Sequence, residues 1–133
     1  MKRSILEIYA LAVCFFTVAC FVIVLGMAVW NFVAISTPEF ALNNIVWEQH
    51  QSDEAFKARL LLEHRYGSDK NTYTAPEGAA LTAARDLSLS RAIASQRHGA
   101  IQDLVRNLII LLIDGIVFFI HWKLAARARQ SAG

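Results

Sequence analysis

Residues 108–122 read LIILLIDGIVFFIHW, an apolar run that carries a carboxylate, Asp114, near its middle. Such an apolar run is a candidate for the central part of a membrane span, and a charged side chain at membrane depth is costly. Such a residue usually faces the inside of a helix bundle, where it makes a specific contact or serves a function. Asp114 is therefore the first candidate functional residue of the chain.

The span around Asp114 extends beyond this run in both directions. From Leu104 to Trp122 it forms about 28 Å of helix, close to the thickness of a hydrocarbon core. Arg106 can extend its charged group to the polar boundary at one end, and Trp122 and Lys123 are the expected interfacial anchors at the other.

A second apolar run lies near the N-terminus. Ile8–Ile35 contains no charged residue, and as a helix it is about 42 Å long, against a hydrocarbon core of about 30 Å. Trp30 is the expected interfacial anchor at its far end. A cleaved signal peptide is the alternative, because Thr17-Val18-Ala19-Cys20 is similar to a lipoprotein cleavage site. The apolar run continues well past Cys20 and Thr17 does not fit that site, so a retained span is favoured.

The composition also favours a membrane protein. Of the 133 residues, 56% are hydrophobic, and the excess is concentrated in the two apolar runs. The net charge of +2 is small and scattered, which gives no support to nucleic-acid binding. The chain has no nucleophile motif, phosphate-binding loop or HExxH pattern, and its histidines lack metal-site spacing. We expect a protein that is not an enzyme and has no cofactor and no metal.

The predicted fold is an all-α membrane protein. Two transmembrane helices form a hairpin, with an extramembrane helical segment between the spans. We expect the N-terminus and first span in residues 1–36, the helical segment in 37–100, the second span in 101–124 and a basic tail in 125–133.

Capping patterns divide the segment between the spans. Ser36-Thr37-Pro38-Glu39 predicts the end of the first span and the start of a new helix. A helix is expected over Asp53–Tyr66, which begins with two acidic residues. Thr74-Ala75-Pro76-Glu77 repeats the capping pattern and predicts a helix that starts at Ala75 and continues through the second span to about Ala126.

Basic residues gather at both ends of the chain. Glu7 alone opposes the basic residues that flank the spans there, which are Lys2, Arg3, Lys123, Arg127 and Arg129. The segment between the spans carries acids and bases in similar number. The positive-inside rule therefore predicts that both termini are cytoplasmic and that the middle segment lies outside.

The second span carries a stripe of four polar residues, at spacings of four and seven: Asp103, Asn107, Asp114 and His121. On a helix they lie within about 40° of one line. Three interpretations remain open. The stripe is a buried contact with a partner helix, a proton or cation path through Asp114 and His121, or a lipid-facing surface.

In an antiparallel pair of spans, Asp114 is level with residues 14–17 of the first span, where Thr17 is the strong hydrogen-bond donor. Glu7 is then level with His121 and Lys123, so two interpretations are open: an ion pair at that edge, or a solvated Glu7. One membrane hydrogen bond returns about 0.6–2 kcal/mol, whereas an ionised aspartate costs about 2.5–3.5 kcal/mol. We expect Asp114 either to be protonated or to face polar groups of another subunit.

Short stretches resemble small bacterial membrane proteins. Phe119-Ile120-His121-Trp122-Lys123-Leu124-Ala125 is similar to a helix end in an uncharacterised bacterial membrane family, where an apolar span closes in His-Trp-Lys or His-Trp-Arg. Glu7–Cys14 and the stretch from Pro38 through Phe56 also resemble small bacterial proteins of unknown function. The resemblance implies a bacterial inner-membrane protein and supplies no activity.

These features favour a small accessory or scaffolding subunit of the inner membrane. It would pack against other membrane proteins through the polar stripe of its second span. The expected partners are the lipid bilayer and either other membrane subunits or copies of itself, with no nucleic acid. The alternative is a homo-oligomeric, channel-like protein in which Asp114 lines a proton or cation path.

Overall fold

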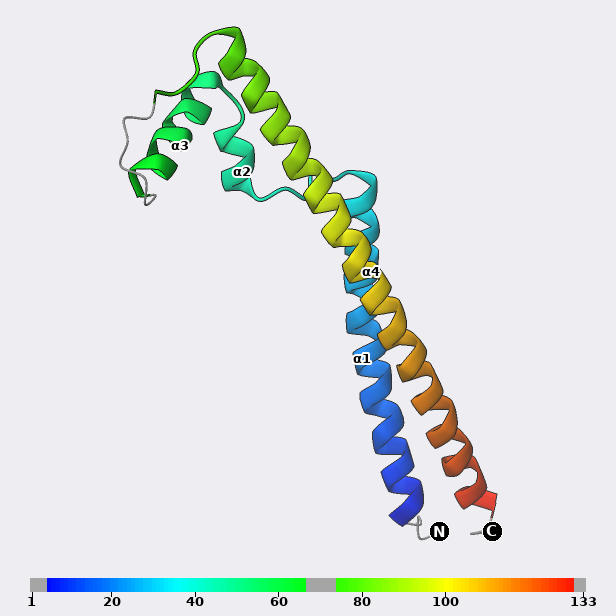
Figure 1. The fold of residues 1–133 in the computed structure, drawn as a ribbon. Helices are drawn as coiled ribbons and strands as arrows, with labels where there is room; N and C mark the ends of the chain where they lie inside the picture. The colour runs from blue at the N-terminus through cyan, green and yellow to red at the C-terminus, as the bar shows by residue number, and fades with distance from the viewer. Residues whose placement is uncertain (1–4, 67–73, 131–133) are drawn as a thin grey trace. The chain divides into compact units, whose positions relative to one another are not determined.

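The computed structural model describes residues 5–66 and 74–130. All regular elements in these ranges are α-helices (Figure 1): α1 (Ile5–Ser36), α2 (Asn44–Gln49), α3 (Asp53–Tyr66) and α4 (Ala79–Gln130). The expected all-helical class is confirmed for this part of the chain. The helices form two compact units. Unit 1 contains α1 as far as Phe32 and α4 from Ala100, and unit 2 contains residues 33–99.

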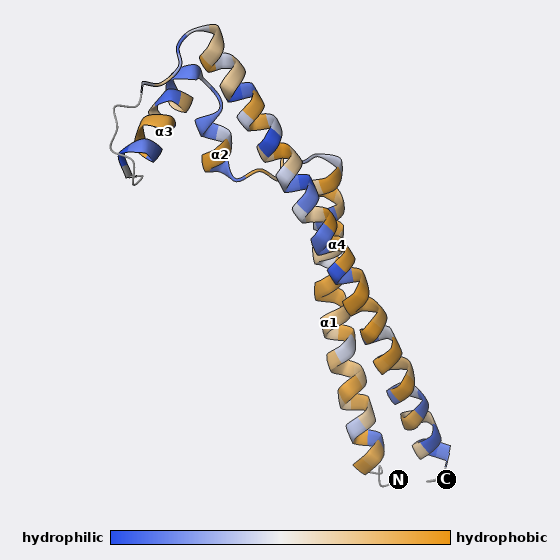
Figure 2. Ribbon diagram, in the orientation of Figure 1, coloured by the Kyte–Doolittle hydropathy of each residue, from blue (hydrophilic) through white to orange (hydrophobic). Residues whose placement is uncertain are grey.

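Within the described residues, α1 and α4 are each long and apolar enough to cross a membrane. In their most apolar stretches, 17% and 6% of the residues are buried, whereas a core helix of a soluble protein is mostly buried. Figure 2 shows hydrophobic residues predominating along α1 and the C-terminal half of α4, and mixed with hydrophilic ones in α2 and α3. Both helices therefore have the length and the exposed apolar surface of membrane spans.

One face of α1 follows a seven-residue repeat in unit 1. Buried or half-buried side chains recur there at Glu7, Ala10, Cys14, Thr17, Val24, Ala28 and Asn31, three or four residues apart except between Thr17 and Val24, where the intervening Phe21 is exposed. This period keeps one stripe of a helix against a partner helix. Two of the members are alanines that are almost fully buried, and such small side chains let two helix backbones approach closely.

The facing stripe of α4 has the same repeat, at Ala100, Leu104, Asn107, Leu111, Asp114, Phe118, His121, Ala125 and Ala128. We call the two facing stripes the seam. Tyr9 contacts His121, and the Cys14 Sγ lies 3.9 Å from the carbonyl oxygen of Phe118. The contacting residues run in opposite directions along the chain, so the two helices are antiparallel here, and Figure 1 shows them side by side.

Unit 2 is held together by polar contacts around α3. Helix α3 has the expected bounds, and the Ser52 Oγ accepts a hydrogen bond from the amide of Ala55 at its start. Asp53 faces α4, where the Thr82 hydroxyl donates to Asp53 Oδ2 over 2.7 Å. Arg85 Nη1 lies 3.0 Å from Asp53 Oδ1 as an ion pair. These contacts fix the first turn of α3 to the first turns of α4.

The start of α4 corrects the sequence prediction. The helix was expected from Ala75, but it begins at Ala79. Gly78 has φ of +56°, a left-handed conformation that suits glycine and interrupts right-handed helix geometry. The amides of Leu81 and Thr82 both donate to the carbonyl of Gly78, at 3.0 and 3.2 Å. Gly78 therefore sets the start of the helix, which then continues without a break to Gln130.

The expected helix after Pro38 is also absent from the described part of the chain. Residues 38–41 form a turn, with the amide of Phe40 bonded to the carbonyl of Thr37 at 3.1 Å. The next helix, α2, begins at Asn44, where the Asn43 side chain accepts a hydrogen bond from the amide of Ile45 at 2.8 Å. The short side chain of Asn43 provides the cap that starts this helix.

Candidate functional site

Three residues of the predicted polar stripe lie on the seam. Asn107, Asp114 and His121 stand seven residues apart, which is the repeat of the seam itself. Asn107 is 2% exposed, whereas Asp114 and His121 are half-buried. Asp103 lies nearer the edge, where its carboxylate pairs with Arg106 at 2.9 Å and remains half exposed. The structure thus places the stripe against α1 and separates Asp103 from the other three by its charged partner.

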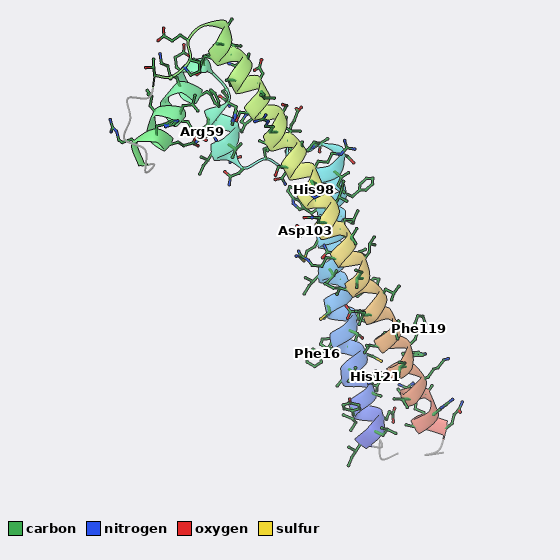
Figure 3. All side chains as sticks on the ribbon, in the orientation of Figure 1. Phe16, Arg59, His98, Asp103, Phe119 and His121 are labelled. Carbon is green, nitrogen blue, oxygen red and sulfur yellow. The ribbon has the colours of Figure 1, made fainter. Side chains whose placement is uncertain are left out.

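His121 has its partners inside unit 1. Its Nδ1 lies 2.8 Å from the carbonyl oxygen of Val117, one turn earlier in α4. A carbonyl only accepts, so Nδ1 is the protonated nitrogen that donates. The His121 ring meets the Tyr9 ring of α1 edge to face, with 5.9 Å between centroids. Figure 3 labels His121 beside α1, and it shows Phe119 of the same helix pointing away.

The expected hydrogen bond between Thr17 and Asp114 is not formed. The Thr17 hydroxyl donates instead to the carbonyl of Cys14 in its own helix, over 2.9 Å. A threonine in a helix commonly makes this local bond, which uses its only proton. Thr17 and Asp114 nevertheless line the same groove. The two residues therefore lie at the same level along α1 and α4, as the antiparallel pairing predicted.

The ion pair of Glu7 differs from the expected one. Glu7 was matched with His121 and Lys123, but its Oε1 lies 2.9 Å from Arg129 Nε. The Glu7 carboxylate is nearly buried in the seam, and the longer arginine reaches it from beyond the end of the apolar run. His121 is held by Val117 and Tyr9.

Two polar atoms of the seam stay unsatisfied. Within residues 5–66 and 74–130, Asn107 Nδ2 and Asp114 Oδ2 are buried and have no hydrogen-bond partner. An ionised aspartate in a span costs about 2.5–3.5 kcal/mol, and an unpaired buried polar group costs about 1–3 kcal/mol. The described contacts inside unit 1 give neither Asn107 Nδ2 nor Asp114 Oδ2 a hydrogen bond that would offset such a cost.

Asp114 borders a groove of about 240 Å³ on one flank of the seam. The groove is lined by Thr17, Val18 and Phe21 of α1 and by Asp114, Gly115, Phe118 and Phe119 of α4. All of its lining except Thr17 and Asp114 is apolar or glycine. The groove is large enough for a side chain, and the surface that it presents is apolar, because Asp114 Oδ2 is buried.

The expected anchors lie at exposed positions. Trp30 and Trp122 are 52% and 53% exposed, and Lys123 is also exposed. The Trp122 ring stacks on Phe118 with 5.9 Å between centroids. Exposed indole rings near the ends of apolar helices suit a membrane–water interface.

A buried histidine in unit 2 was only weakly indicated by the sequence. His50 is 5% exposed, and its Nδ1 donates to the carbonyl of Val46 at 2.6 Å. Its Nε2 is therefore an acceptor, and the Ser88 hydroxyl and Arg59 Nη1 lie 3.0 and 3.4 Å from it. The ring also packs on Phe56, with 5.4 Å between centroids. Ser88 lies thirty-eight residues away in sequence, so spacing gave no signal for this cluster.

Comparison with known proteins gives the chain no family. No family model, no curated protein and no solved structure matches it. No known family therefore supports the short resemblances noted in the sequence. Among the described residues, no group of three or more His, Cys, Asp or Glu side chains is placed to hold a metal ion.

Proposed function

We propose that the chain is a small, non-enzymatic accessory or scaffolding subunit of a bacterial inner membrane. Its two apolar helices cross the bilayer as a hairpin with both termini in the cytoplasm, and unit 2 lies outside. The protein binds another membrane protein through the flank of the seam that carries Asp114. It acts as a binding surface, and the three stripe residues that lie on the seam, Asn107, Asp114 and His121, select the partner.

The unsatisfied carboxylate of Asp114 carries this proposal. Its Oδ2 is buried and has no hydrogen-bond partner within the described ranges, although it lies next to an open groove. Charged side chains in membrane spans pair with other groups or line a polar path. The exposed apolar surfaces beside the groove, which include Phe119 at 64% exposure, suit contact with lipid or with a second helix.

Native mass spectrometry of a mild detergent extract tests the proposal. We expect a complex that contains this chain and at least one different membrane protein. A ring made of this chain alone would instead support the channel-like alternative, in which Asp114 lines an ion path, and would overturn the accessory role.

Asp114→Leu provides the matched variant for the same experiment. It leaves the partner's polar group unpaired in a dry contact, which costs about 1–3 kcal/mol and corresponds to roughly 5- to 150-fold weaker binding. Asp103→Leu is the control, because Asp103 is half exposed and its pair with Arg106 contributes only about 0–1 kcal/mol. Equal recovery of the complex with Asp114→Leu would show that this residue does not contact a partner.

Reporter fusions test the orientation. A reporter after Gly133 should be cytoplasmic, and one inserted at residues 68–71, which lie outside the described ranges, should be external. The physical reason is the excess of basic residues near both ends of the chain. A cytoplasmic signal from the insertion at 68–71 would reverse the proposed orientation.

A further inference from the structure

A second, smaller hollow lies in line with the groove beside Asp114. The hollow is about 30 Å³ and is lined by Leu11 of α1 and by Trp122, Ala125, Ala126 and Arg129 of α4. Five of the α4 residues share one face of that helix, Gly115 and Phe119 at the groove and Trp122, Ala126 and Arg129 at the hollow. They all lie within about 40° of the direction of Gly115. The groove and the hollow therefore follow one line along the same flank of the seam.

The two ends of this line differ in polarity. The surface of the groove is apolar, because Asp114 Oδ2 is buried. The hollow ends at Arg129, whose side chain is 59% exposed. The Arg129 Nε donates to Glu7 Oε1, and the guanidinium group has further N–H donors on its terminal nitrogens. Lys123 and Arg127 are also exposed here, so bases outnumber Glu7 at this edge.

The length of the line matches one leaflet of a bilayer. Arg129 lies fourteen positions after Gly115, which is about 21 Å along a helix. A bilayer with its head groups is about 40–45 Å thick, so one leaflet is about 20–22 Å. Trp122 stands between the two ends and is 53% exposed, as suits a ring at the membrane–water interface. The flank therefore offers a basic end, an interfacial ring and an apolar groove in the order in which a lipid needs them.

We propose that this flank binds one anionic phospholipid from the leaflet on the side of the chain termini. The Arg129 guanidinium donates to the phosphate group, and one acyl chain runs past Trp122 into the groove over Gly115. Basic pockets between membrane helices recognise lipid head groups in this way. The site rests on the crossing of the membrane proposed above, and it adds a lipid to the surface that the partner protein contacts.

Native mass spectrometry of the purified full chain with added lipid tests the site. Phosphatidylglycerol and phosphatidylcholine with identical acyl chains are titrated separately in the same mild detergent. Both lipids carry a phosphate group, and they differ in net charge. We expect phosphatidylglycerol to bind at least about fivefold more tightly, because basic residues at a membrane surface attract anionic lipids. Equal binding of the two lipids would overturn the inference.

Gly115→Leu tests the acyl end of the site. A Cβ built on Gly115 has no atom within 4 Å among the described residues, so leucine fits the fold and fills the groove. Binding of both lipids should fall at least about fivefold, and the preference for phosphatidylglycerol should remain. Gly26→Leu is the matched control, because Gly26 of α1 is equally open and does not line the groove. Unchanged binding with Gly115→Leu would place the acyl chain elsewhere and overturn the site.

Arg129→Gln tests the head-group end. The preference for phosphatidylglycerol should fall to within about twofold, because the donor to the phosphate group is lost. Arg127→Gln is the matched control and should lose less of the preference, since it removes the same charge about 160° away around the helix. Glu7→Gln also breaks the pair with Arg129 but leaves the guanidinium in place, so it should keep or increase the preference. Equal losses in Arg129→Gln and Glu7→Gln would overturn the head-group contact.

The lipid titration and the native extract fail in distinguishable ways. A native complex with a different protein, together with equal binding of the two lipids, would overturn the lipid site and leave the accessory role standing. A native ring of this chain alone, with the lipid preference intact, would do the reverse. Self-association of the purified chain that Gly115→Leu abolishes would mean that a second copy fills the groove, and it would also overturn the lipid site.

Discussion

The two units handle buried polar groups differently. In unit 2, the buried ring of His50 has partners at both nitrogens, and Thr82 donates to Asp53 Oδ2. Asp53 Oδ1 is buried without a hydrogen bond, but Arg85 lies 3.0 Å from it as an ion pair. In the seam of unit 1, Asn107 Nδ2 and Asp114 Oδ2 have no hydrogen-bond partner in the described part of the chain. Both units are helical, so the difference lies in the completeness of their polar contacts.

This difference indicates which unit needs another molecule. A polar group that has no protein partner at a water-exposed surface bonds to water at little cost. A polar group between apolar helices has no water to bond to, so it keeps the full free-energy cost of burial without a hydrogen bond. Unit 2 closes its own network from residues distant in sequence. In unit 1, Asp114 Oδ2 has no hydrogen-bond partner among the described residues and Asp114 borders a groove, which is the arrangement expected of a surface that a second membrane protein completes.

The stability of unit 2 depends most on the packing of Phe56. This side chain is 3% exposed and packs on His50, with Arg59 5.9 Å above its ring. We expect Phe56→Ala to destabilise unit 2 by about 3–5 kcal/mol, because a large buried side chain is lost and a cavity remains. Denaturant unfolding in micelles, followed by the fluorescence of Trp47, measures the change. An unchanged midpoint would show that unit 2 is held from outside.

A smaller effect is expected at the edge of unit 1. Glu7→Gln removes the charge that pairs with Arg129 and should cost about 1 kcal/mol or less, because Arg129 is 59% exposed and reaches water when unpaired. A double-mutant cycle with Arg129→Gln measures the coupling. A coupling of several kcal/mol would mean that unit 1 is held together by this pair, and the contrast between the units would weaken.

The smallest effect is expected at the surface of unit 2. Lys57 Nζ donates to Glu77 Oε1 over 2.8 Å, and this hydrogen bond together with the lysine charge lowers the pKa of Glu77. A carboxyl group with a lowered pKa in the folded state stabilises that state above its unfolded pKa, and the contribution is lost as the pH falls through the lowered value.

Lys57→Met should therefore return the pKa of Glu77 toward its ordinary value and remove this acid-side contribution. The carboxyl ¹³C shift of Glu77, followed by NMR as the pH is lowered, gives the result. A titration curve that does not move in the variant would contradict the assigned cause.

Much of the helical framework could be predicted from local signals. The bounds of α3 follow from Ser52 at its start and the two acids in its first turn. The seven-residue spacing of Asn107, Asp114 and His121 was visible in the sequence, and it matches the repeat that packs α4 on α1. These features depend on residues close together in the chain, so sequence patterns report them directly.

Other features depend on backbone conformation or on distant residues. Gly78 starts α4 later than Ala75 through a positive φ, and the capping pattern around Pro76 does not reveal that. The long Arg129 side chain reaches Glu7 from near the end of α4. Matching residues by their depth in the membrane had favoured His121 and Lys123 instead. The Thr17 hydroxyl donates to a carbonyl within its own helix, so it is not available as a hydrogen-bond donor to Asp114.

Recovery of the native complex from an Asp114→Leu variant tests the central claim most directly. The complex is isolated in mild detergent from the parent chain, from Asp114→Leu and from the control Asp103→Leu, and its amount is measured by native mass spectrometry. We expect only Asp114→Leu to lose the complex, because it leaves a polar group of the partner unpaired in a dry contact. Equal recovery from all three would contradict a partner that completes unit 1 at Asp114.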